Sequence, residues 1–159
     1  MAFYDWLLAL HVLAAFSLVA ALVLYTVIIA ASWNLSLPGD VSRMFRLSRV
    51  GDAAIAVGAL GTLVLGIWLA IDSDEYQVWD GWVIAALVLW VLSMETGRRT
   101  GAVYNAVRDR ARALVAEGPD TPRPELNAML RSTTGLAFHA ATVVLIVALL
   151  VVMIYKPGA

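Results

Sequence analysis

Four long runs of apolar residues dominate the sequence, and their lengths are typical of helices that cross a bilayer. A helix needs roughly 20 apolar residues to cross about 30 Å of hydrocarbon. The runs cover residues 3–31, 53–71, 82–96 and 135–155. The third run reaches spanning length only when Glu95 and Thr96 are included. The five prolines lie between or beyond the runs, so each span is expected to be an uninterrupted helix.

This pattern predicts an all-α polytopic membrane protein, with a single domain over residues 1–159 that forms a four-transmembrane-helix bundle. The connection over residues 97–133 carries a further signal, because apolar residues recur there at helical spacing between arginines. They are Val103, Ala106, Val107, Ala111, Leu114 and Val115. We expect an amphipathic cytoplasmic helix that either continues the third span or lies on the membrane surface. It should end near Gly118, with a second short helical turn over residues 122–131.

The charges of the connections predict the orientation. Arginines occupy the first and third connections, and they are Arg43, Arg46, Arg49, Arg98, Arg99, Arg108, Arg110, Arg112, Arg123 and Arg131. The middle connection is acidic and has no basic residue, with Asp72, Asp74, Glu75 and Asp80. By the positive-inside rule, the arginine connections lie in the cytoplasm and both termini lie outside. Aromatic residues gather at the expected outer ends, namely Tyr4, Trp6, Tyr76, Trp79, Trp82 and Tyr155.

Composition excludes several classes of protein. Hydrophobic residues make up 62% of the chain and charged residues 14%, whereas a soluble domain averages about 45–50% and about 25%. A soluble enzyme domain and a disordered chain are therefore excluded, and the lipid bilayer is the expected environment. A net charge of −1 argues against nucleic acid as a partner. The absence of cysteine removes disulfides and thiolate metal sites.

A face of small residues follows the second span. Ala54, Gly58, Thr62 and Gly66 recur every four residues, so they lie along one ridge of the helix. Such a ridge lets another helix backbone approach closely. The approaching helix could belong to the same bundle, or to a second subunit in a homo-oligomer or a larger membrane complex. The sequence leaves both open.

Ionisable residues within spans are costly and therefore are candidates for function. At about 1.5 Å per residue, His11 lies about 10 Å below the outer boundary and His139 about 24 Å below it. Two histidines on neighbouring helices suggest a bis-imidazole haem. However, their depths differ by roughly 14 Å. One haem held by both is therefore disfavoured, and a haem held by His11, or two separate sites, fits better.

Glu95 is expected about 20 Å deep, near His139. The two form a possible polar pair, since a carboxylate and an imidazole stabilise each other by a charge-assisted hydrogen bond. Glu95 could instead pair with Arg98, three residues further along. Asp52, near the inner edge, could pair with Arg49 or Arg99. His139 is then either a satisfied bundle histidine or a ligand or proton carrier.

The opening segment, Trp6-Leu-Leu-Ala-Leu-His11-Val-Leu-Ala-Ala15, resembles the first helix of an uncharacterised family of bacterial four-helix integral-membrane proteins, a domain of unknown function. It is more distantly similar to the copper-resistance D proteins and the membrane protoporphyrinogen oxidase. The ending, from Met153 to Ala159, resembles actinobacterial members of the uncharacterised family. This resemblance implies a multi-pass protein of the bacterial plasma membrane.

The resemblance also implies a role for the first-helix histidine, here His11, as a haem or metal ligand. The residues after it, from Phe16 to Ala20, lack the tryptophan–methionine–glycine run of the oxidase, and no span contains a lysine. These differences argue against porphyrinogen oxidation. Five scattered methionines and no cysteine argue against Cu(I) transport.

The leading hypothesis is a redox-associated membrane protein that binds haem b, with His11 and His139 as candidate cofactor ligands and His11 as the metal ligand. Two alternatives stay open. The chain could be a non-catalytic structural or assembly subunit of a larger membrane complex. It could also be a small transporter or proton pathway that uses Glu95 and His139.

The predicted orientation can be tested with reporter fusions. Fusions at Arg46 and Arg110 should report the cytoplasm, and one at Asp74 should report the outside, because the arginine connections are expected to be retained on the cytoplasmic side. A paired phosphatase and fluorescent-protein assay measures each position. A cytoplasmic signal at Asp74 would reverse the orientation.

Overall fold

The structure is a computed structural model that describes residues 2–72 and 77–157, and these residues form helices and their connections, with no strand among them. The helices are α1 (Ala2–Ser32), α2 (Pro38–Met44), α3 (Ser48–Asp72), α4 (Gly81–Glu117), α5 (Pro124–Leu130) and α6 (Thr133–Tyr155). Some residues named above lie outside the described residues, namely Asp74, Glu75, Tyr76 and Ala159. All-α architecture is therefore confirmed.

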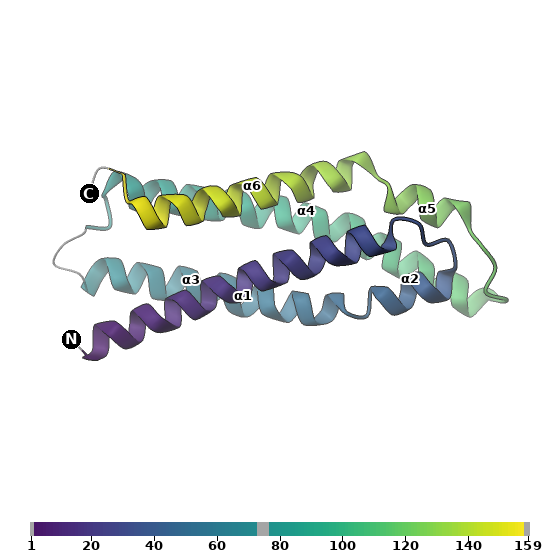
Figure 1. Ribbon diagram of the computed structural model, residues 1–159, viewed down its shortest axis with the longest axis horizontal. Helices are drawn as coiled ribbons and strands as arrows, with labels where there is room; N and C mark the ends of the chain where they lie inside the picture. Colours follow the sequence, from purple (N-terminus) through teal and green to yellow (C-terminus); the bar gives the residue numbers. More distant parts are fainter. Residues whose placement is uncertain (1, 73–76, 158–159) are drawn as a thin grey trace.

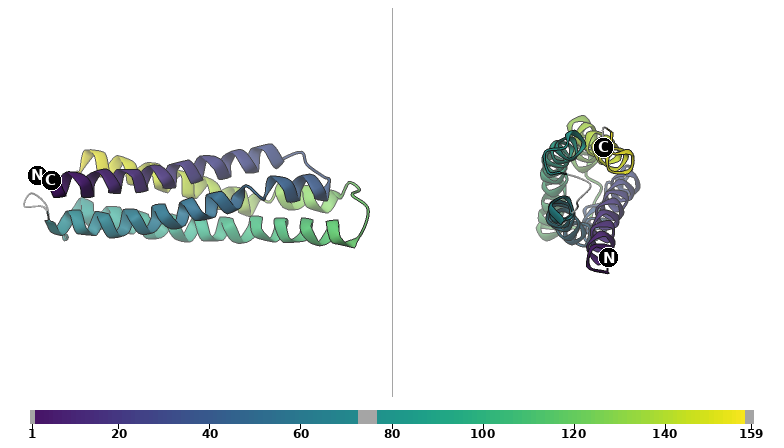
Figure 2. Two further views of the ribbon diagram at one scale, coloured as in Figure 1. Left: turned by 90° about the horizontal axis from the view of Figure 1, so that it is seen from below. Right: turned by 90° about the vertical axis from the view of Figure 1, so that its left-hand side faces the viewer.

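Four segments are long and apolar enough to cross a membrane, namely 3–32, 38–72, 81–117 and 124–155. They run antiparallel, and both ends of the chain lie at the same end of the bundle (Figures 1 and 2). We call this the termini end. The opposite end holds α2 and α5 (Figure 1), and we call it the arginine end because the segments that carry the arginines lead to it.

α4 continues the third apolar run as one helix. The amphipathic segment therefore extends the third span, as the first of the two options drawn from the sequence proposed, and does not form a separate helix. Its 37 residues extend about 55 Å, well beyond about 30 Å of hydrocarbon. In the second half of α4, Tyr104, Val107, Ala111 and Leu114 are buried at helical spacing. Val115, which the sequence pattern placed on the same face, is 46% exposed.

A small apolar core fills the arginine end. It joins the last turns of α1, the short helices α2 and α5, and the second half of α4. The rings of Phe45 and Tyr104 stack with centroids 6.2 Å apart, and Val41 and Leu126 are fully buried beside them. α2 lies in the first connection, between the first two spans, and begins at Pro38, because a proline is well suited to the first turn of a helix.

α1 packs along α3 through the small-residue face. A Cβ atom added at Gly58 would lie 2.8 Å from the backbone nitrogen of Leu18 and 2.9 Å from the carbonyl oxygen of Ala14. One added at Gly66 would lie 2.9 Å from Cε1 of His11. Ser17 donates a 3.0 Å hydrogen bond to the carbonyl of Ala54. The face thus serves packing within this bundle in the structure.

α4 and α6 form the second close pair. Thr142 on α6 donates to Thr96 on α4 at 2.9 Å, and the guanidinium of Arg99 lies 5.3 Å from the ring centre of Phe138. The bundle is therefore two helix pairs, α1 with α3 and α4 with α6, that are joined mainly at the arginine end (Figure 1).

The glycine contact predicts a stability difference between two matched substitutions. Gly58→Ala should lower the free energy of unfolding by about 1–3 kcal/mol, because its methyl group meets backbone atoms that cannot move aside. Gly101→Ala, in the interior of α4 with nothing within 4 Å of the new methyl group, should be neutral or stabilising by up to ~1 kcal/mol. Unfolding in detergent, followed by circular dichroism, measures both. Equal effects would mean that α1 and α3 do not pack closely at Gly58.

Candidate functional site

Two cavities lie between the helix pairs. The first, with a volume of about 510 Å³, is lined by His11 and residues toward the termini end, and we call it the His11 cavity. The second, about 500 Å³, is lined by His139, Asp52 and residues toward the arginine end, and we call it the His139 cavity. Leu18 and Ile146 line both. The cavities exist because each helix packs closely on its pair partner and loosely on the other pair.

The imidazole of His11 lies against α3 in the notch that Gly66 leaves. The Cβ position at Gly66 is 2.9 Å from Cε1, 3.4 Å from Nδ1 and 4.0 Å from Nε2 of the ring. The ring thus presents its Cε1–Nδ1 edge to α3, and Nε2 is the nitrogen further from it. Nδ1 is buried and makes no hydrogen bond of standard geometry to the described residues. The backbone of Thr62 lies close to the ring.

The walls of the His11 cavity are mostly apolar, with leucine, isoleucine and tryptophan side chains from both helix pairs. The indole Nε1 of Trp90 on α4 is buried there, with no hydrogen-bond partner among the described residues. Lys156 also lines the cavity, and its ammonium lies 5.5 Å from the ring centre of Trp82. A flat apolar ligand with an acidic edge at the termini end fits this combination of groups.

His139 bridges the two helix pairs. Its Nε2 lies 2.9 Å from the hydroxyl oxygen of Thr26 on α1. That hydroxyl donates its single proton to the carbonyl of Leu22 at 2.8 Å. With that proton directed to Leu22, the hydroxyl has only lone pairs left for His139, which favours the ring tautomer that carries its proton on Nε2. The sequence analysis did not assign His139 this partner.

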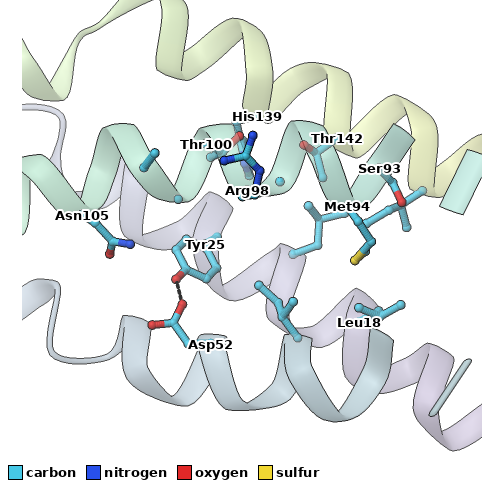
Figure 3. Close-up of a pocket in the computed structure, with 16 residues that line it drawn as sticks. Leu18, Tyr25, Asp52, Ser93, Met94, Arg98, Thr100, Asn105, His139 and Thr142 are labelled. Carbon is cyan, nitrogen blue, oxygen red and sulfur yellow. Dashed lines mark hydrogen bonds between the residues drawn. The ribbon is translucent and has the colours of Figure 1, made fainter. Parts of the chain in front are cut away.

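Tyr25 and Asp52 form the other polar contact of the His139 cavity (Figure 3). The phenol of Tyr25 on α1 donates a short hydrogen bond to Oδ1 of Asp52 on α3. The predicted pairing of Asp52 with Arg49 or Arg99 is wrong, because the side chain turns toward α1. Arg99 instead binds Glu95 at 2.7 Å.

Glu95 does not pair with His139 in the structure, which corrects the polar pair drawn from depth alone. Both its oxygens are taken by arginines of the same helix. Arg98 donates to it at 2.8 and 2.9 Å, and Arg99 donates at 2.7 Å. The carboxylate therefore faces outward, with 39% of its side chain exposed, whereas His139 turns toward α1.

The two histidines line different cavities and have different partners. His11 lies nearer the termini end and His139 nearer the arginine end, which is the order that the depth estimate from the sequence gave. No group of three or more His, Asp or Glu side chains gathers in the described part of the chain. A free metal ion held by several protein ligands thus has no ready site there, while a haem, which needs one or two axial ligands, has a candidate in His11.

The Tyr25–Asp52 contact was missed by sequence reasoning, although the signal was present. Counted from Tyr4, Tyr25 lies about 31 Å deep, and Asp52 lies about 28 Å deep on the same scale. Equal depth on neighbouring helices would have favoured this pair over an arginine. Thr26 gave no such signal, because its pairing with His139 depends on how α1 rotates against α6.

The fold defines a polytopic four-helix membrane protein with two cavities between its helix pairs. The chain matches the family described as "Predicted integral membrane protein (DUF2269)" over residues 5–157. It therefore belongs to this family, in agreement with the resemblance drawn from its first and last segments. Comparisons with curated proteins and with solved structures found no match. Similarity to the copper-resistance D proteins and to protoporphyrinogen oxidase thus stays an expectation.

Proposed function

We propose that the protein binds haem b in the His11 cavity, with Nε2 of His11 as an axial ligand, and takes part in electron transfer at the bacterial plasma membrane. The observation that carries this proposal is the orientation of His11. Nδ1 is buried and lies closer than Nε2 to the notch at Gly66, so Nε2 is the nitrogen left for a ligand in an apolar cavity of about 510 Å³.

Three requirements of haem b have counterparts among these residues. Haem needs an axial nitrogen, which Nε2 of His11 supplies. It needs a water-poor space of suitable size, and the cavity volume falls within the range of about 300–1,000 Å³ typical of cofactor sites. Its propionates need a cationic or polar edge, and Lys156 lines the cavity at the termini end.

The backbone of Thr62 supports the proposed ligand role of His11. A histidine that binds metal through one nitrogen usually donates its other N–H to a carboxylate or carbonyl, which fixes the tautomer and the ring orientation. The backbone of Thr62 lies close to the ring of His11, and its carbonyl would accept the N–H of Nδ1 in the haem-bound state. This would leave Nε2 unprotonated, as iron ligation requires.

Bound haem would supply reversible one-electron chemistry. The chain would supply the rest. His11 would set the position of the iron along the bundle, the apolar side chains of both helix pairs would exclude water, and Lys156 would hold the acidic edge near the membrane surface. The two open alternatives, an assembly subunit of a larger membrane complex and a small transporter, do not require a coloured protein.

The haem proposal predicts a difference between two matched histidine substitutions. Protein purified from haem-supplied cells should show a Soret band. His11→Ala should lose most of this band, whereas His139→Ala, in the other cavity, should keep most of it. The reason is that only His11 lines the cavity proposed for haem. Absorbance spectra with a pyridine haemochrome assay measure the haem content of each variant.

Two outcomes would contradict the proposal. Equal loss of haem in both variants, with both still folded by circular dichroism, would mean that one haem is held by both histidines. Colourless wild-type protein that copurifies with a larger assembly would favour the subunit alternative.

A further inference from the structure

The His139 cavity presents a hydrogen-bond acceptor from the α4–α6 pair. In the ring tautomer that the Thr26 contact favours, Nε2–H donates to Thr26, and Nδ1 of the neutral ring is an unprotonated acceptor. No carboxylate among the described residues forms an ion pair with this ring. The histidine thus favours a ligand that donates a proton to a hydrogen bond.

The α1–α3 pair presents a second acceptor to the same cavity. Asp52 accepts from Tyr25 through Oδ1, which leaves Oδ2 and its lone pairs available. No arginine is within ion-pairing distance of Asp52 in the described structure. Figure 3 shows Tyr25 and Asp52 on one side of the cavity and His139 on the other, so the two acceptors come from opposite walls.

The walls around these acceptors carry apolar side chains together with the polar side chains of Ser93, Arg98, Thr100, Asn105 and Thr142. Leu18, Leu22 and Ile55 line the α1–α3 side, and Met94 and Ile146 line the other. A ligand that matches this cavity has a hydrophobic body and a hydrogen-bond donor at each end. An anion does not match, since the acceptor atoms would repel it and the nearby Arg98 is engaged by Glu95.

We propose that the His139 cavity binds an aromatic ring with two hydroxyl groups, as in the head group of a membrane quinol. One hydroxyl donates to Nδ1 of His139 and the other to the carboxylate of Asp52. The ring lies between the apolar side chains of the two helix pairs. This site is separate from the His11 cavity, and the inference does not rest on haem binding.

The same aromatic diol chemistry could come from a lipid-soluble quinol or from a water-soluble diphenol. The two sources differ in the alkyl tail. A tail would leave the His139 cavity between the two helix pairs that form its walls. The experiment therefore compares a decyl-substituted benzohydroquinone with the same ring without the tail.

The chain offers a clean spectroscopic probe because it has only two histidines. In His11→Ala protein labelled with ¹⁵N-histidine, the ring signals come from His139 alone. Under anaerobic conditions in lipid nanodiscs, decyl-benzohydroquinone should shift the Nδ1 signal as that atom accepts a hydrogen bond. The dimethyl ether of the same compound, which has no donors, should bind at least about tenfold more weakly.

A pair of matched variants tests the second acceptor. Asp52→Asn should weaken hydroquinone binding about tenfold or more, because it removes a charge-assisted hydrogen bond. Asp40→Asn, at an exposed ion pair with Arg43 outside the cavity, should leave the affinity unchanged. If His11→Ala protein does not fold, the NMR experiment is replaced by thermal unfolding of proteins that keep His11. The rise in melting temperature with hydroquinone is then compared with that for the dimethyl ether, and between wild-type protein and Asp52→Asn.

The outcomes decide between the possibilities. Binding of the decyl compound well above that of the tail-less ring supports a membrane quinol, and equal binding overturns the quinol assignment in favour of a soluble diphenol. Equal affinity for hydroquinone and its dimethyl ether, or an unmoved Nδ1 signal at saturation, overturns the two-acceptor site. Loss of haem in His11→Ala is a separate result, so failure of either proposal leaves the other testable.

Discussion

The close contact of α1 with α3 is the feature on which the rest of the structure depends. It requires residues without side chains, since a Cβ atom at Gly58 or Gly66 would collide with α1. In a bilayer the lipid tails are as apolar as leucine, so helices associate through such packing and through hydrogen bonds rather than by the hydrophobic effect. The contact commits α1 to α3 and leaves α4 and α6 as the second pair.

That pairing explains why the polar groups gather between the pairs. Polar and ionisable side chains within spans are costly where they face lipid and so turn toward the bundle interior, and the notch at Gly66 receives the ring of His11. Further along, Asp52 finds Tyr25, and His139 reaches across to Thr26. The apolar core at the arginine end holds the two pairs together, which allows cavities to persist along the remaining length.

The four spans could be predicted from the sequence because apolar length alone distinguishes a membrane helix. The small-residue ridge from Ala54 to Gly66 was also visible, but its partner was not, since a ridge fits a helix of the same chain or of a second copy. Helix ends were less certain: α4 runs on to Glu117 because its buried face continues past the apolar run.

The candidate sites were predictable in part. His11 and His139 stood out as ionisable residues in apolar spans, and counting along the helices separated them by depth. Depth does not give rotation about a helix axis, however. Glu95 was therefore assigned to His139, whereas its side chain turns to Arg98 and Arg99. The cavities depend on the distance between the two helix pairs, and the residue pattern of a single helix does not give that distance.

Disulfide trapping tests the central claim, the intramolecular pairing of α1 and α3, most directly. The chain has no cysteine, and a Cβ atom added at Gly61 would lie 2.7 Å from that of Ala14. A disulfide spans about 3.5–4.5 Å between Cβ atoms, so α1 and α3 need to part by only about 1 Å for the bond to form. In membranes, the double variant Ala14→Cys, Gly61→Cys should oxidise to a disulfide within one chain. A disulfide-linked dimer from Gly61→Cys alone, with no intramolecular bond in the double variant, would contradict the account and place the glycine face between subunits.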